Sequence, residues 1–206
     1  MQKNAQIEIN NKNLNSKIME KQTINTIPSE SNFTLNKVKL VKNGGLDVHF
    51  EVVEVFGDET YTNKYHIESA KDIHPDLAKQ FQLLRPIMGR IFNLTSYLSM
   101  VECADFNASK EQVDYARDFA GKVLENIEVR GVSLSGKDDN IGVVLTGQYT
   151  VSNDMQTSIK SPKIKIGEEQ FGFEDDLYDI LGMIESEVYA FLFKGKKAQL
   201  ELFGDE

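Results

Sequence analysis

The chain has 206 residues, of which 40% are hydrophobic and 27% charged, a balance typical of a globular protein with one domain or two small ones. Its formal net charge of −9 at pH 7 repels a phosphate backbone, which excludes a generally basic nucleic-acid-binding surface and leaves only a local basic face for such a role. The single cysteine excludes a disulfide framework and a cysteine-based zinc site, and the lack of a long apolar run predicts no membrane span.

The first segment, residues 1–32, is predicted to be a disordered N-terminal arm, because it is rich in Asn, Lys, Gln and Ser and shows no hydrophobic period. It also lacks the apolar core of a secretory signal, so we expect a cytoplasmic protein. A single domain is predicted over 33–197, followed by a docking peptide at 198–206.

Three strands are predicted at the start of this domain. Hydrophobic residues alternate with polar ones over 38–40 and 48–52, on either side of Asn43-Gly44, a dipeptide that favours the positive φ angles of a tight hairpin. Gly57-Asp58 predicts a second turn, and residues 61–67 a third strand.

Helical patterns follow. Pro75 suits a first helical position, and apolar residues at three- and four-residue spacing from Leu77 to Leu98 predict a helix that Pro86 should kink or split. Ser109-Lys110-Glu111-Gln112 has the pattern of a capping box, which predicts the start of another helix.

From Ile127 the period returns to two, which predicts strands over 129–134, 141–151 and 158–166. A last helix is predicted over 174–193, because three acids suit its positive N-terminus and apolar residues recur on one face.

The resulting order is βββα, a linking helix, then βββα. It predicts an α+β fold in which helices pack on one face of an antiparallel sheet. The order also suggests two similar halves, 33–105 and 126–197, although they share no obvious residue identity.

The sequence gives no reason to expect an enzyme. Residues 131–137 resemble a phosphate-binding loop, but Asp138 and Asp139 follow where Ser or Thr should ligate magnesium, and the next segment is a predicted strand. No GxSxG elbow is present, and no acid precedes a lysine by two residues, as a PD-(D/E)xK nuclease requires. We predict no catalytic residue and no cofactor, while carboxylates assembled from distant positions leave an enzymatic activity open.

The three histidines, His49, His66 and His74, are interpreted as structural or surface residues. None forms a His-x-His or His-x-x-x-His pair, so a metal site would need long-range assembly, and no metal is predicted. Four acids near the second turn could hold a cation, but exposure to solvent is the favoured interpretation of Glu51, Glu54, Asp58 and Glu59.

A basic edge is a candidate contact for single-stranded DNA. If the last strand and the end of the last helix come together, six cations could follow a backbone, with Tyr149 or Phe171 available for base stacking. The alternative is that the lysines protect an edge strand and cap a helix. The six are Lys160, Lys163, Lys165, Lys194, Lys196 and Lys197.

The C-terminal segment Gln199-Leu200-Glu201-Leu202-Phe203 follows a helix stop at Gly195. It resembles the clamp-binding motif of bacterial replication and repair proteins, usually Gln-Leu-(Ser/Asp)-Leu-Phe, and departs from it only at Glu201, the tolerant middle position. The resemblance implies that Gln199 hydrogen-bonds in the groove of a sliding clamp while Leu200, Leu202 and Phe203 fill apolar pockets. The alternative is a final strand that packs on its own domain.

The chain from Val38 to Phe203 also resembles uncharacterised proteins of bacteriophages and prophages of gut Bacteroidetes. This resemblance implies an origin and a bacterial host cytoplasm, and it implies no mechanism. The segments that carry it are 42–46, 73–77, 128–136 and 187–200.

The leading hypothesis is therefore a non-enzymatic phage accessory protein of DNA replication or recombination. It would dock on the host sliding clamp through its tail and could touch single-stranded DNA. Two alternatives are a phage structural or assembly protein whose tail completes a neighbour's sheet in a homo-oligomer, and a counter-defence protein that binds a small molecule.

Overall fold

The computed structural model describes residues 27–42, 44–103, 107–136, 141–152, 155–165 and 172–196. These residues hold seven strands and four α-helices, and the strands pair antiparallel, so the predicted α+β class is confirmed. They divide into two compact units: the described residues up to Leu77 together with those from Glu185 onward, and residues 78–184. Both boundaries fall inside long helices.

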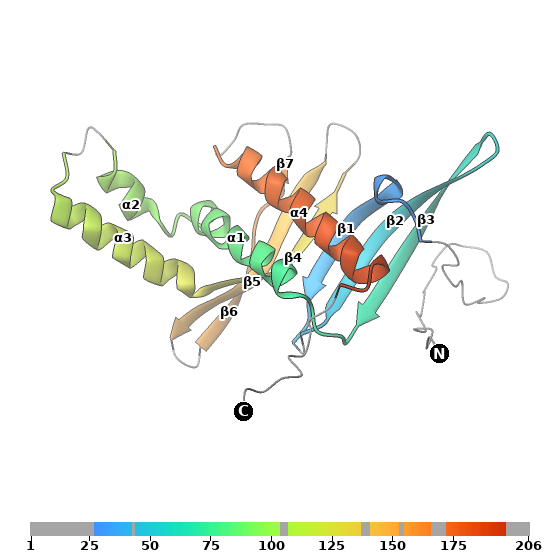
Figure 1. Cartoon of the computed structure of the whole chain (residues 1–206). Helices are drawn as coiled ribbons and strands as arrows, with labels where there is room; N and C mark the ends of the chain where they lie inside the picture. The colour runs from blue at the N-terminus through green and yellow to red at the C-terminus, as the bar shows by residue number, and fades with distance from the viewer. Residues whose placement is uncertain are drawn as a thin grey trace, which may run out of the picture. The chain divides into compact units, whose positions relative to one another are not determined.

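In the first unit, β2 is the central strand of an antiparallel meander (Figure 1). Gly44, at φ 80°, lies in the first turn, and Gly57, at φ 63°, lies in the second, so both predicted turns are confirmed at residues that tolerate left-handed backbone. A short 3-10 turn, η1 (Glu30–Asn32), leads into the strands β1 (Phe33–Leu40), β2 (Leu46–Phe56) and β3 (Glu59–Ser69).

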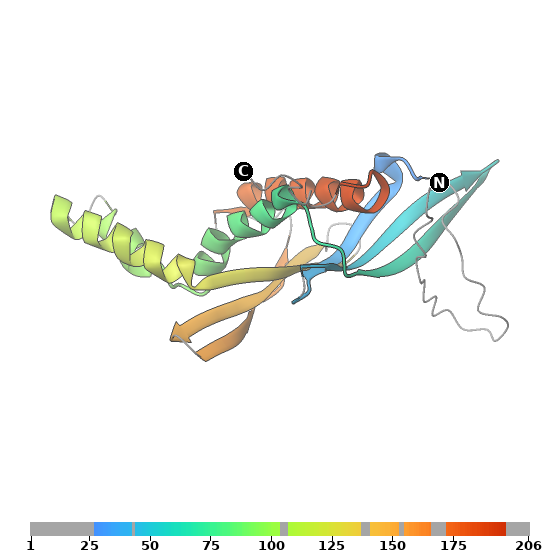
Figure 2. The ribbon, with the colours of Figure 1, turned by 60° about the horizontal axis from the view of Figure 1, so that its bottom comes forward.

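The second half of α4 (Glu174–Phe193) covers one face of these three strands (Figure 2). The ring of Phe193 lies 6.0 Å from that of Phe33 and 5.8 Å from that of Phe50, and Tyr189 lies 5.6 Å from Phe33. The predicted packing of a helix on one sheet face is therefore present in this unit. Further buried residues of this inner face are Leu35, Val38, Leu46, Val48 and Val52.

In the second unit, β5 is the central strand and pairs with β4, β6 and β7. Gly89 marks a close approach of helices, because a Cβ there would come within 2.5 Å of Leu124 Cδ2. The elements are most of α1 (Pro75–Ile91), the paired helices α2 (Ser96–Val101) and α3 (Lys110–Glu125), β4 (Ile127–Ser135), β5 (Gly142–Ser152), β6 (Met155–Lys160), β7 (Ile164–Lys165) and the first half of α4.

The helix predicted over 77–98 is interrupted, although not at Pro86. Helix α1 continues through Pro86 to Ile91, and the break comes where Asn93 takes φ 56° and Leu94 donates its N–H to the carbonyl of Gly89 at 2.9 Å. Asparagine is one of the few residues that enter the left-handed region readily, so it ends the helix where the proline does not.

The predicted capping box is confirmed at α3. The Ser109 hydroxyl accepts from the Gln112 N–H at 3.3 Å, and the Gln112 side chain accepts from the Ser109 N–H at 2.8 Å. The prediction of one strand over 158–166 is wrong, because pairing with β5 passes from β6 to β7 through Ser161 and Pro162. There the Ser161 hydroxyl accepts the Leu145 N–H at 2.9 Å, and Pro162 has no N–H to donate.

Candidate functional site

The face of β1–β3 opposite α4 carries a group of polar side chains. Alternate residues of β2 from Leu46 to Val52 are buried, so Asp47 and His49 project from the other face. The strand registers place Lys37 of β1 and His66 of β3 opposite His49. We call Lys37, Asp47, His49 and His66 the outer-face cluster.

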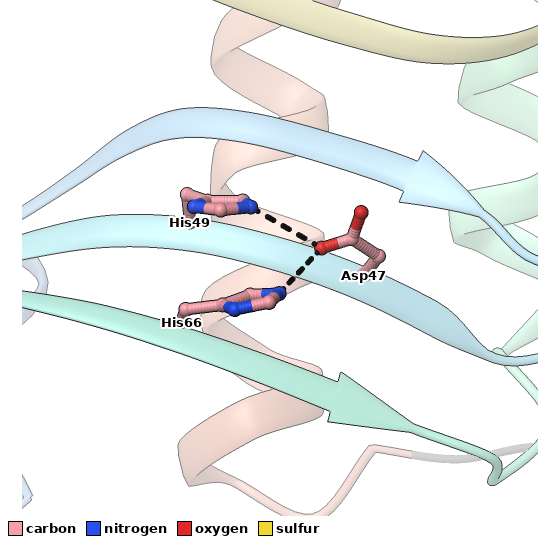
Figure 3. A group of neighbouring side chains, drawn as sticks. All are labelled: Asp47, His49 and His66. Atoms are coloured by element: carbon pink, nitrogen blue, oxygen red, sulfur yellow. Dashed lines mark hydrogen bonds and ion pairs between the residues drawn. The ribbon is translucent and has the colours of Figure 1, made fainter. Parts of the chain in front are cut away.

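The two imidazoles of the outer-face cluster converge on one carboxylate oxygen (Figure 3). Nε2 of His66 lies 2.9 Å from Oδ1 of Asp47, and Nε2 of His49 lies 3.4 Å from the same oxygen. The rings are stacked, with centroids 4.1 Å apart and planes inclined by 11°. Two strands therefore present two nitrogens and one oxygen within a small volume.

Lys37 lies on the other side of the carboxylate. Its Nζ is 2.8 Å from Oδ2 of Asp47 and 3.3 Å from Nε2 of His49. Because an ammonium can only donate, the contact with His49 requires an unprotonated Nε2 on that ring. His66, in turn, has to donate its Nε2–H to Asp47, since a carboxylate can only accept.

The electrostatics agree with that proton assignment. Burial lowers the pKa of His49, and the neighbouring imidazole of His66 and ammonium of Lys37 lower it further against the opposing effect of Asp47. Burial alone would raise the pKa of Asp47, but Lys37 and the two histidines hold it below the ordinary value. At neutral pH the cluster thus contains an ionised carboxylate and a neutral His49.

The sequence contained a signal for the pairing of His49 with His66, although no local motif shows it. A two-residue turn at Gly57-Asp58 pairs Phe56 with Glu59, and stepping back along both strands pairs His49 with His66. Asp47 follows on the same face, two residues before His49. Two histidines that pair across a hairpin have no characteristic spacing within one segment.

A second group lies at the end of α4, and we call His74, Asp76, Glu187 and Lys196 the helix-end cluster. Nζ of Lys196 is 2.8 Å from Oδ2 of Asp76 and 2.8 Å from Oε1 of Glu187. Nδ1 of His74 accepts the backbone N–H of Asp76 at 3.2 Å. The contacts with Asp76 and Glu187 raise the pKa of Lys196, so its ammonium is the cation of this cluster.

The lysines predicted as a basic edge divide between the units. Lys160, Lys163 and Lys165 belong to the second unit. In the first unit, Lys194 has Nζ 3.2 Å from Oε2 of Glu30 and 4.9 Å from the ring centre of Tyr189. Lys194 and Lys196 are thus both paired with carboxylates.

Several predicted residues lie outside the part of the chain that the structure describes. They are Lys197, Phe171 and the four predicted clamp-binding residues Gln199, Leu200, Leu202 and Phe203. The predicted disordered arm, residues 1–32, is described only from residue 27.

The four acids near the second turn do not converge on one point among the described residues. Glu51 accepts from Lys64 at 2.9 Å, and Glu54 accepts from the Asn63 amide at 2.8 Å. Glu59 accepts from the hydroxyl of Tyr61. Glu51 and Glu54 thus have partners on the neighbouring strand, and Glu59 has its partner two residues along its own strand.

The second unit also has an open, polar hollow of about 330 Å³. Its lining includes a single cationic side chain, that of Arg90, among hydroxyl and amide groups. The lining residues are Arg90, Asn93, Thr95, Ser96, Ser99 and Phe173.

Comparison with models of known protein families, with curated proteins and with solved structures gives no match to this chain. Among the helices of the described residues, none combines the length and the apolar character needed to cross a membrane.

Proposed function

We propose that this chain is a bacteriophage accessory protein of DNA replication or recombination that docks on the sliding clamp of its bacterial host through residues 198–206. The observation that carries the proposal is the segment Gln199–Phe203, which has four of the five residues of the clamp-binding motif in order. Leu200, Leu202 and Phe203 would fill apolar pockets, and a few such anchors supply most of the affinity of peptide-in-groove complexes.

The structure describes the end of α4 up to Lys196, just before the proposed docking peptide. Gly195 takes φ 71°, and the N–H of Lys196 donates to the carbonyl of Ala190 at 3.1 Å, so the helix stops here. The helix-end cluster then holds the Lys196 side chain by two carboxylates. Gln199 follows only three residues later in the sequence.

The proposal is tested by measuring binding of the full chain to an immobilised clamp of a Bacteroidetes host. Replacing two apolar anchors in Leu202→Ala/Phe203→Ala should weaken binding at least about 100-fold, because buried interface anchors contribute on the order of 2 kcal/mol each. Glu201→Ala is the matched control at the tolerant position and should change the Kd less than about threefold. Unchanged binding by the double variant would contradict a role of the tail.

A second part of the proposal is contact with single-stranded DNA through the six lysines of the predicted basic edge, Lys160, Lys163, Lys165, Lys194, Lys196 and Lys197. A fluorescence titration with a labelled oligonucleotide at two salt concentrations tests it, since affinity from phosphate contacts falls steeply with salt. The absence of binding at low salt would end this part and leave the clamp proposal untouched.

A further inference from the structure

We infer that Asp47, His49 and His66 form a binding site for one divalent transition-metal ion, with Zn²⁺ the best fit. The inference goes beyond the proposed docking function, because it concerns the outer face of β1–β3 and does not involve the tail. It depends on a convergence of three potential ligand atoms, all within 4.8 Å of one another.

The spacing of these atoms suits a small metal ion. Zinc binds imidazole nitrogen and carboxylate oxygen at about 2.0–2.2 Å, so neighbouring ligand atoms of a tetrahedral site lie about 3.4 Å apart. The observed distances from Oδ1 of Asp47 are 3.4 Å to Nε2 of His49 and 2.9 Å to Nε2 of His66. Because the two rings are stacked and nearly parallel, an ion can enter when both imidazoles rotate until their Nε2 lone pairs point at it and the proton on Nε2 of His66 moves to Nδ1.

The donor set selects the class of ion. Magnesium and calcium prefer oxygen ligands, whereas two imidazoles with one carboxylate suit zinc, iron, nickel or copper. Three protein ligands leave a coordination position open for water, as in zinc sites that act on substrates. His49 and His66 have side chains that are 40% and 31% exposed, so solvent can reach that position.

Lys37 is a positioning residue in this site. Its bond to Oδ2 of Asp47, at 2.8 Å, turns Oδ1 toward both rings, and it can persist when a metal occupies Oδ1. Its contact with Nε2 of His49, at 3.3 Å, has to break when the ring ligates an ion. The ammonium therefore both orients the carboxylate and competes with the metal.

The helix-end cluster shows why a group of similar residues is not an equivalent site. Lys196 already bridges Asp76 and Glu187, so an ammonium takes the position that a metal would need. The cluster has one imidazole, and Nδ1 of His74 accepts a backbone N–H. His74 is therefore the matched control for His49 and His66.

The experiment is a calorimetric titration of ZnCl₂ into the untagged, chelator-treated full chain. We expect one ion per chain, and a higher Tm in the presence of zinc because the ion binds the folded state. Asp47→Asn and His66→Gln should each weaken zinc binding at least about tenfold, since the loss of an outer partner alone produces an effect of that size. His74→Gln should bind as the wild type does.

The proposal has three contradicting outcomes: no saturable binding by the wild type, equal binding by Asp47→Asn and His66→Gln, and loss of binding in His74→Gln. Thermal unfolding without metal separates a ligand role from misfolding. The side chains of Asp47, His49 and His66 are partly exposed, so variants at these positions should stay folded. A second readout is Co²⁺, whose visible absorption reports a tetrahedral nitrogen and oxygen environment in the wild type and should disappear in His49→Gln.

Discussion

The two faces of β1–β3 are built from alternate residues of the same strands and have opposite character. The inner face presents Val38, Val48 and Phe50 to the second half of α4, and all three are fully buried. The outer face presents Asp47 and His49 from the same central strand, together with Lys37 of β1 and His66 of β3. The inner face supplies the stability of this unit, while the outer face can vary in chemistry without disturbing the packing.

The strongest test of that contrast is Phe50→Ala on the inner face. Loss of a fully buried phenylalanine, whose ring contacts Phe33, Tyr65 and Phe193, should lower the free energy of unfolding by about 3–5 kcal/mol. His49→Gln, one residue earlier on the outer face, should change it by less than about 1 kcal/mol when a chelator is present. Equal effects in denaturant titrations would remove the distinction between the faces.

Glu185 of α4 bonds to the backbone of β1, and removal of its carboxylate should have the next largest effect. Oε1 of Glu185 accepts the N–H of Leu35 at 2.8 Å, beside the irregular pairing between Leu35 and Lys37. Glu185→Leu leaves that N–H without an acceptor and should destabilise the chain by about 1–3 kcal/mol. Glu185→Gln keeps an acceptor oxygen and is the control, so chemical denaturation should place it close to the wild type.

The same pair of variants predicts a pH dependence. Burial raises the pKa of Glu185 above its ordinary value of 4.5, against the opposing bond from the N–H of Leu35. A raised pKa means that the protonated form favours folding, so this contribution is present at acid pH and is lost as the pH rises through the folded-state pKa. The stability of Glu185→Gln relative to the wild type should increase over that interval. A constant difference from pH 4 to pH 7 would contradict the assignment.

On the outer face, the smallest expected effect comes from Lys37→Met. Removing the ammonium frees Nε2 of His49 and removes a repelling charge, so zinc should bind roughly five- to tenfold more tightly. Calorimetry with the variant and the wild type measures this ratio. Weaker binding in the variant would mean that orientation of Asp47 outweighs competition by the lysine.

Elements whose signals are local were predictable from the sequence. The turns at Gly44 and Gly57, the capping box at Ser109 and the last helix over 174–193 depend on neighbouring residues alone, and all are present. The predictions were wrong where tertiary packing and side-chain hydrogen bonds determine where an element ends. Helix α1 is not split at Pro86, and Ser161 interrupts the strand predicted over 158–166.

The outer-face cluster was not predicted because its members come from three strands. Its geometry depends on the register of two hairpins, and only that register brings Lys37, His49 and His66 opposite one another. The pairing of Lys196 with Asp76 joins residues still farther apart in the chain. Such contacts carry no signature within a single segment.

The most direct test of the central claim, that residues 198–206 dock on a sliding clamp, is a competition measurement. A synthetic peptide of these residues is added to the complex of the full chain with the host clamp, and displacement is followed by fluorescence anisotropy. We expect complete displacement, with a Kd for the peptide close to that of the full chain, and no displacement by a peptide carrying Leu202→Ala and Phe203→Ala. A full chain that does not bind the clamp, or stays bound at saturating peptide, would contradict the claim.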